Sequence, residues 1–187
     1  MKRSSIFLVM IIAFISCEKP QIRKPVVHHS TVSSFDESVQ LTKKVLALEE
    51  KIFKKIIKKD TINKYYASPY GFWYFYNHKI EKNTKKPSTG DEVVINYEIK
   101  DLNNKVILSE QELGSKNQDN KKNRLLKIDG EDFLLGLHHG IKLMKEGEIM
   151  TFLLPSNLAF GVTGLQGKIG SNEPLIVKVK LIKILTK

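Results

Sequence analysis

The sequence predicts an α+β domain, in which an antiparallel twisted sheet wraps one short helix, and an amphipathic helix precedes that domain. Two segments, residues 91–101 (DEVVINYEIKD) and 175–185 (LIVKVKLIKIL), alternate apolar and polar side chains with the period of two that half-buried strands show. Between them, FLLGLHHGIKLM from Phe133 places apolar residues at helical spacing. Further short strand-like segments outnumber this helix, which favours α+β over an all-helical fold.

The composition indicates a soluble domain that is rich in lysine. Of the 187 residues, 41% are hydrophobic and 27% are charged, which disfavours a protein with several membrane spans. The net charge of +11 would suit a nucleic acid or an anionic membrane as partner. We find no arginine cluster, aromatic RNA-binding motif or zinc-finger spacing, so no nucleic acid is expected as a partner.

Residues 1–17 predict a lipoprotein signal peptide. A positive start, MKRSS, precedes an apolar run that is too short to cross a bilayer core of about 30 Å as a helix. Ser16 and Cys17 end this run and resemble the lipobox of bacterial lipoproteins, although Phe14 stands where leucine is usual. Cys17 would then be a lipid anchor on the cell membrane or outer membrane, on the periplasmic or cell-surface side. The alternative is an ordinary secretory peptide that leaves a free thiol.

Residues 34–66 predict a helical arm after a flexible tether of residues 18–33, which is rich in proline and charge. Ser34 and Glu37 fit a capping box, a sequence that satisfies free amide donors where a helix starts. From there to about Asp60, apolar residues recur at helical spacing. They are Leu41, Val45, Leu46, Leu48, Ile52, Phe53 and Ile56. Such a stripe can pack on the main domain or on a twin helix, so a homodimer through this helix is an expected partner arrangement.

The opposite face of the arm is basic. It carries Lys43, Lys44, Lys51, Lys54, Lys55, Lys58 and Lys59. We favour a solvated face, and the alternative is attraction to an anionic bilayer, at about 1 kcal/mol per cation near the surface.

Residues 69–187 predict the main domain. Besides the two alternating segments above, strands are expected at 71–80, 105–111, 125–128 and 149–155, separated by turns and a polar loop at 114–124. The helix from Phe133 should bury one face, made of Leu134, Leu137, Ile141 and Met144. His138 and His139 are neighbours on this helix, point in different directions and are expected at the solvated surface. No histidine pair has a third ligand nearby, so no metal or other cofactor is expected.

Five blocks in order give the domain a family resemblance. They are SPYGFWYF, GDEVVINYEIKD, FLLGLHHGIKLMKEGE, FLLPSNLAFG and PLIVKVKLIKI. From Gly71 onward the chain resembles the FKBP-type peptidyl-prolyl cis-trans isomerases, the macrolide-binding immunophilins, which implies an FKBP-like fold. Together with the lipobox and the lysine-rich helix, the SPYGFWYFY block resembles the gliding-motility-associated lipoprotein branch of that family.

The resemblance implies catalysis without acids, bases or metals. The X-Pro amide resists rotation because resonance gives its C–N bond double-bond character, with a barrier of about 18–20 kcal/mol. The planar amide is more charge-separated than the twisted amide, so a dry apolar pocket disfavours the planar form relative to the twisted one.

The family's pattern assigns the site residues by position. It implies catalytic roles for Tyr97, Phe133, Leu134, Leu137 and Phe160. It implies substrate binding by Ile107, Leu108, Leu165, Ile169 and Val177.

Five of these residues depart from the pattern. Leu137 replaces a tryptophan floor, Phe160 replaces a tyrosine, Ile107-Leu108 replaces a Phe-Asp pair, and Val177 replaces a phenylalanine. Each lost neutral hydrogen bond is worth about 0.5–1.5 kcal/mol. The expected function is a membrane-anchored isomerase that assists folding or assembly of exported, proline-containing client proteins, including gliding-motility machinery. The alternatives are a non-catalytic chaperone or assembly subunit that uses the same groove, and a structural lipoprotein whose basic helix docks on membrane.

Overall fold

The computed structural model describes residues 31–82, 85–114, 123–130 and 134–185, and for residues 31–34 it describes only the backbone. The chain divides into two compact units, Met1–Glu37 and Ser38–Lys187. The first helix, α2 (Thr31–Lys59), runs across this boundary, and the contacts below all lie within the second unit. The predicted signal peptide, Cys17 and the tether up to residue 30 lie outside the described residues.

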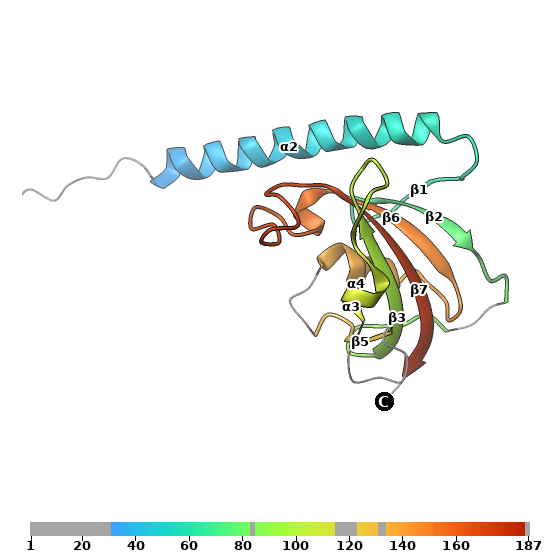
Figure 1. The fold of residues 1–187 in the computed structure, drawn as a ribbon. Helices are drawn as coiled ribbons and strands as arrows, with labels where there is room; N and C mark the ends of the chain where they lie inside the picture. Colours follow the sequence, from blue (N-terminus) through green and yellow to red (C-terminus); the bar gives the residue numbers. More distant parts are fainter. Residues whose placement is uncertain (1–30, 83–84, 115–122, 131–133, 186–187) are drawn as a thin grey trace, which may run out of the picture. The chain divides into compact units, whose positions relative to one another are not determined.

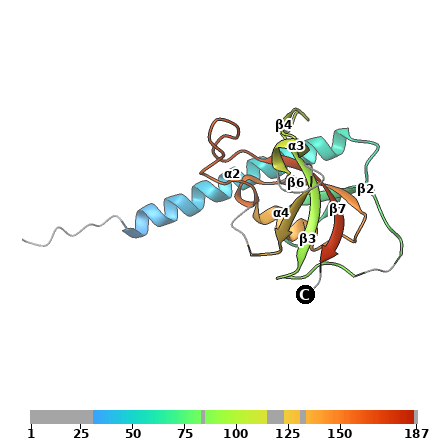
Figure 2. The same ribbon diagram turned by 60° about the horizontal axis from the view of Figure 1, so that its bottom comes forward.

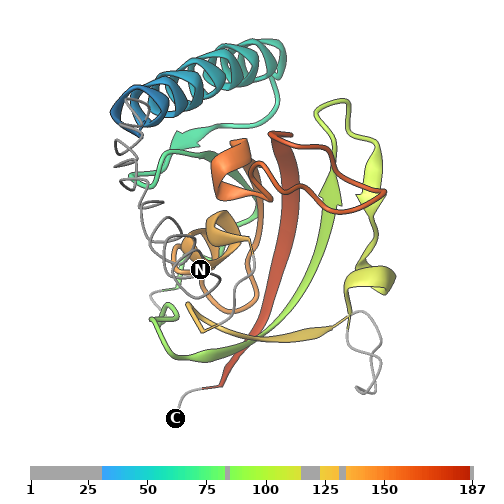
Figure 3. The same cartoon turned by 90° about the vertical axis from the view of Figure 1, so that its left-hand side faces the viewer.

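A seven-stranded antiparallel sheet forms the body of the second unit (Figure 1). Its strands are β1 (Tyr66–Ala67), β2 (Trp73–His78), β3 (Glu92–Lys100), β4 (Val106–Leu108), β5 (Arg124–Lys127), β6 (Ile149–Leu154) and β7 (Leu175–Leu185). The strand order is β1-β2-β6-β7-β3-β4, with β5 paired to β3. The two alternating segments of the sequence are therefore neighbours, since β3 and β7 pair along their length, with Tyr97 opposite Val179 (Figure 3).

Three short helical segments complete the described part of the chain. They are α3 (Glu110–Leu113), α4 (Leu135–Ile141) and the 3-10 turn η1 (Ser156–Leu158). Figure 2 shows α4 with β3, β6 and β7 from a second direction. The predicted α+β class and FKBP-like sheet with one core helix are confirmed, and α3 is an addition.

The main core lies between α4 and one face of the sheet. Leu134, Leu137, Ile141 and Met144, the face predicted for this helix, are 0–2% exposed, which confirms that prediction. They belong to one cluster with alternate residues of the strands, such as Phe152 and Val177. Alternate strand residues point to one side, so their neighbours point away from this core.

A smaller cluster lies on the opposite face of the sheet and holds α2. Phe53 packs there with Phe75 and Leu153, the strand residues that point away from the main core. Glu50 adds a bond at this contact, because Trp73 Nε1 donates to its carboxylate at 3.0 Å. The second half of α2 is therefore fixed to the sheet by one aromatic side chain and by polar contacts.

The apolar stripe predicted for α2 is only partly the buried one. Phe53 is 1% exposed, and Val45, Leu46 and Ile56 are half-buried. Leu41, Leu48 and Ile52 are exposed, at 62%, 59% and 41%. The predicted stripe follows the most apolar line of the helix, whereas the structure buries a line about a quarter-turn away, centred on Glu49 and Phe53.

Three predicted boundaries are also corrected. Ser34 lies within α2 rather than at its start, because extending an existing helix costs much less than nucleating one. The strand predicted at 105–111 ends at Leu108, where the Ser109 N–H donates to the Glu112 carboxylate at 2.9 Å and starts a helical turn. The helix at Phe133 is shorter than predicted, since its last residues bond at i→i−3, as in Met144 N–H to Ile141 O.

Candidate active site

Nine of the ten predicted site residues lie in one apolar cluster. Six are buried members of the main core: Tyr97, Leu108, Leu134, Leu137, Ile169 and Val177. The other three, Ile107, Phe160 and Leu165, are half-buried and pack against it. The tenth residue, Phe133, lies outside the described residues. The structure thus brings together side chains from β3, β4, α4, β7 and the loop after η1.

These nine residues divide into a floor and a rim. The six buried residues are 0–6% exposed, so they form the floor rather than a surface that a ligand touches directly. Ile107, Phe160 and Leu165 keep exposed area and stand where a bound chain can contact them. The apolar environment therefore comes mostly from the floor, and direct contact comes from the rim.

The loop between η1 and β7 carries Phe160, Leu165 and Ile169 and is closed by its own backbone. Gly161 N–H donates to Ser156 O at 2.8 Å, and Gly164 N–H donates to Phe160 O at 3.1 Å. Leu165 and Ile169 form an isolated antiparallel bridge, which folds the loop back on itself. Phe160 is thus held between two backbone bonds.

Arg124 is a polar neighbour of the site that the sequence analysis missed. Its guanidinium points a donor at the Tyr97 hydroxyl at 3.5 Å, which is longer than the roughly 2.7–3.2 Å usual for an N–H···O hydrogen bond and makes this a weak contact. Arg124 pairs with Ile95 in the sheet, so it is a diagonal neighbour of Tyr97 on the same face. The strand pairing was needed to find this contact, because 27 residues separate the two side chains along the chain.

A second missed contact joins two elements beside the rim. Lys168 Nζ lies 2.7 Å from a Glu112 carboxylate oxygen, which connects α3 to the loop after η1. This bond first, and the Ser109 backbone and hydroxyl next, lower the pKa of Glu112 to about 2. A cavity of about 380 Å³ adjoins this ion pair. Its lining residues are Asp101, Lys105, Val106, Ile107, Gly167, Lys168 and Glu173.

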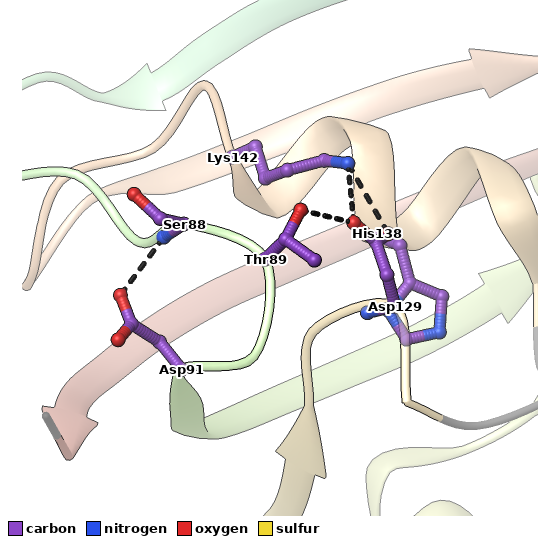
Figure 4. A network of polar contacts seen from close by, with 6 residues as sticks. All are labelled: Ser88, Thr89, Asp91, Asp129, His138 and Lys142. Atoms are coloured by element: carbon purple, nitrogen blue, oxygen red, sulfur yellow. Dashed lines mark hydrogen bonds and ion pairs between the residues drawn. The ribbon is translucent and has the colours of Figure 1, made fainter. Parts of the chain in front are cut away.

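A polar network ties the C-terminal end of α4 to the turns before β3 and after β5 (Figure 4). The Asp129 carboxylate accepts from Lys142 Nζ at 2.8 Å and from the Thr89 hydroxyl at 2.6 Å, and the Lys142 bond chiefly lowers its pKa. The Asp129 N–H donates to His138 Nδ1 at 3.1 Å. His138 is 2% exposed, so its predicted surface position is wrong, because the imidazole is needed to satisfy this backbone donor.

The nine clustered side chains contain no carboxylate, imidazole or amine, and the Tyr97 hydroxyl is the one polar group among them. Within the described ranges, no three His, Cys, Asp or Glu side chains gather in a way that could bind a metal. None of the helices described is long and apolar enough to span a bilayer. The described part of the chain is therefore an α+β domain, in which an antiparallel sheet wraps the helix α4 and an apolar site lies beside that helix.

Comparison with protein families identifies this class. Residues 83–182 match the family model described as FKBP-type peptidyl-prolyl cis-trans isomerase, which covers more than half of the 187 residues. The chain therefore belongs to the FKBP-type peptidyl-prolyl cis-trans isomerase family.

Two curated bacterial proteins are similar over the same region. One is called "probable FKBP-type peptidyl-prolyl cis-trans isomerase FkpA" and comes from Neisseria meningitidis; it is 33% identical over 109 residues, 57% of this chain and 37% of that protein. The other is the "peptidyl-prolyl cis-trans isomerase Mip" of Coxiella burnetii, 33% identical over 103 residues, 55% of this chain and 41% of that protein. The match spans about two-fifths of the length of these relatives.

Two solved structures share the fold. A peptidyl-prolyl cis-trans isomerase of Pseudomonas syringae superposes with a TM-score of 0.58 at 16% identity, over 78% of this chain and 96% of that one. FkpA of Escherichia coli superposes with a TM-score of 0.56 at 20% identity, over 100% of this chain and 83% of that one.

Proposed function

We propose that this chain is a peptidyl-prolyl cis-trans isomerase that acts on exported, proline-containing proteins. The observation that carries the proposal is the single apolar cluster that nine family-assigned side chains form, with Ile107, Phe160 and Leu165 at its open side. A prolyl residue seated against this rim leaves water for an apolar environment. That environment disfavours the charge-separated planar amide relative to the twisted one, and so lowers a barrier of about 18–20 kcal/mol.

The chain's own residues supply the environment and few polar handles. Phe160 has no hydroxyl to donate to a bound carbonyl, and Leu108 has no carboxylate. Each missing neutral hydrogen bond costs about 0.5–1.5 kcal/mol, or about threefold to tenfold in rate. The proposed enzyme is therefore slower than a family member with both groups, and its affinity for macrolides is lower still because such ligands use the polar groups.

The test is a protease-coupled isomerisation assay with X-Pro tetrapeptides, using the full chain in detergent. The parent should accelerate isomerisation, and Phe160→Tyr should raise kcat/KM about threefold to tenfold by restoring one donor. Val162→Thr is the matched control, because Val162 lies in the same loop and is 74% exposed. A folded parent without acceleration, and a Phe160→Tyr variant equally inactive, would exclude the isomerase function.

A non-catalytic holding function is the second candidate, and the absence of both polar groups favours it. In that case the same rim binds unfolded client chains without changing the rate of isomerisation. Suppression of aggregation by a chain that is inactive in the tetrapeptide assay would support this candidate, and loss of suppression in Phe160→Ala would assign it to the same rim.

The cellular setting is also a proposal. The lipobox-like sequence at Cys17 supports a lipid anchor on the cell membrane or outer membrane. Labelling with a radioactive fatty acid tests this anchor, and the label should be lost in Cys17→Ser.

The exposed side chains of Leu41, Leu48 and Ile52 support a homodimer through α2. Sedimentation of the parent and of Leu48→Glu tests this dimer. The resemblance to the gliding-motility-associated branch supports clients in that machinery, and a deletion strain that glides normally would exclude them.

A further inference from the structure

The bond between α2 and the site loop has no role in the function proposed so far. The Ser156 N–H donates to a carboxylate oxygen of Glu49 at 3.0 Å, across 107 residues of sequence. Both residues are buried, with Glu49 4% exposed and Ser156 2% exposed. The second carboxylate oxygen of Glu49 is also buried and has no hydrogen-bond partner among the described residues.

A carboxylate at this buried position would be unfavourable if packing were its only role. The side chains next to it on the same face of α2 include Leu46 and Phe53, and burying a carboxylate with one oxygen unpaired carries a desolvation penalty that a leucine would avoid. Among the described residues, the bond from the Ser156 N–H is the one hydrogen bond that offsets this penalty. The bond to Ser156 therefore accounts for the presence of a carboxylate at this buried position.

Ser156 connects Glu49 to the turn that carries Phe160. The carbonyl oxygen of Ser156 accepts from Ala159 N–H at 3.0 Å and from Gly161 N–H at 2.8 Å, the residues on either side of Phe160. The α2 segment runs beside this turn. Leu41, Thr42, Val45 and Leu46 line a cavity of about 70 Å³ with Ser156, Asn157, Val162 and Asn172.

We propose that Glu49 is a positioning residue: its carboxylate fixes Ser156, and through the two bonds of Ser156 it fixes the turn that presents Phe160 to the bound chain. The helical arm is then part of the machinery of the site rather than only a connection to the membrane. The proposal rests on the proposed function for its catalytic consequence, whereas its structural consequence can be measured without any activity.

The experiment compares three variants of the full chain. Glu49→Leu removes the acceptor at nearly constant size, and Glu49→Gln keeps an acceptor oxygen while removing the charge. Glu50→Leu is the matched control, because Glu50 also bonds α2 to the domain, through Trp73 Nε1, but has no hydrogen bond or ion pair with the described residues of the turn. Amide hydrogen exchange at Ser156, Ala159 and Gly161 is measured together with kcat/KM on X-Pro tetrapeptides.

In Glu49→Leu, exchange at these three amides should rise about tenfold, because a buried donor loses its partner. The rate of isomerisation should fall about threefold to tenfold in the same variant. Glu49→Gln should stay within about twofold of the parent in both measurements, and Glu50→Leu should leave exchange in the turn unchanged.

Unchanged exchange in a folded Glu49→Leu would overturn the proposal. So would an equal rise in Glu50→Leu, because the effect would then come from detachment of the whole helix. If Glu49→Leu does not fold, Glu49→Met, which also removes the acceptor, takes its place: a rise in exchange at the three amides would support the proposal, and no rise would overturn it. If the parent is inactive on tetrapeptides, the proposed function fails by itself, and the exchange comparison still decides whether Glu49 holds the turn.

Discussion

Phe160 and Leu108 show how single side chains set the chemistry of this site. Both are apolar at positions where the family pattern has a hydroxyl and a carboxylate, and both pack against the common core cluster. One polar contact at the site is the long bond from Arg124 to the Tyr97 hydroxyl. Binding at this site therefore depends on shape complementarity with the ligand and on the exclusion of water. Both depend on how firmly the loop that carries Phe160 and Leu165 is held.

Gly164 provides a test of that loop at the level of one residue. Gly164 and Gly167 both have positive φ, 63° and 73°, a region where a side chain is strained. A Cβ on Gly164 would lie 2.5 Å from Ile169 O, whereas a Cβ on Gly167 would meet nothing within 4 Å. Gly164→Ala should break the Leu165–Ile169 bridge and lower kcat/KM at least about fivefold, beyond the strain of about 1 kcal/mol common to both variants.

The measurement is the tetrapeptide assay with a thermal melt of each variant. Gly167→Ala serves as the control for the strain of positive φ alone. Equal losses in the two variants would mean that the close approach at Ile169 O has no part in shaping the site.

At the scale of elements, the fixed half of α2 depends on a small contact. Phe53, Phe75 and Leu153 form the buried part of the cluster between this helix and the sheet. The exposed apolar side chains of α2 do not contribute to it, although they are as apolar as those that do. Hydrophobicity along a helix therefore predicts that one face is buried, but the face is chosen by what the sheet presents, here Phe75 and Leu153.

Phe53 and its neighbour Ile52 should differ in the free energy of unfolding. Phe53 is 1% exposed and Ile52 is 41% exposed. Phe53→Ala should cost about 3–5 kcal/mol, because it removes a buried ring and leaves a cavity, and Ile52→Ala should cost under about 1 kcal/mol. Urea unfolding followed by circular dichroism measures both, and similar costs for the two variants would contradict the packing of α2 on the sheet.

At the scale of the whole molecule, the periodic and motif-bearing parts were predictable from the sequence. Strands β3 and β7 and the buried face of α4 follow from alternation and helical spacing, and β6 follows from a short apolar run; each of these patterns lies within one element. The contacts that were missed join distant residues, such as Glu49 with Ser156 and Lys168 with Glu112. No local pattern encodes such pairs, because they depend on sheet pairing and on the path of a loop.

The burial of His138 was missed for a related reason. Its place on α4 could be counted from the sequence, but its partner, the Asp129 N–H, comes from a residue in the preceding turn with a positive φ of 56°. The clustering of the site residues could be predicted because the order of the family's motifs, rather than periodicity, assigned those residues.

The stability of the whole fold should decrease on acidification in two stages. Burial, more than the nearby Lys142, lowers the pKa of His139 from its ordinary 6.5, so the unfolded chain takes up a proton first and the folded state loses stability as the pH falls below about 6.5. Asp60, bonded first by the Asn63 side chain, and Glu112, bonded first by Lys168, each have a pKa lowered to about 2. Their contribution is complete above the ordinary values of 3.8 and 4.5 and is lost as the pH falls from there towards about 2.

Urea unfolding from pH 8 to pH 2.5 measures both stages. His139→Phe should remove the first stage while keeping the ring stacked on Tyr70, whose centroid lies 4.2 Å from that of His139. Glu112→Gln should reduce only the second stage, and by a small amount because its carboxylate is exposed to solvent and its ion pair is screened. A stability curve that is flat between pH 7 and pH 5 in the parent would contradict the assignment to His139, and a second stage unchanged in Glu112→Gln would place the acid-sensitive contacts at Asp60 and Asp129 instead.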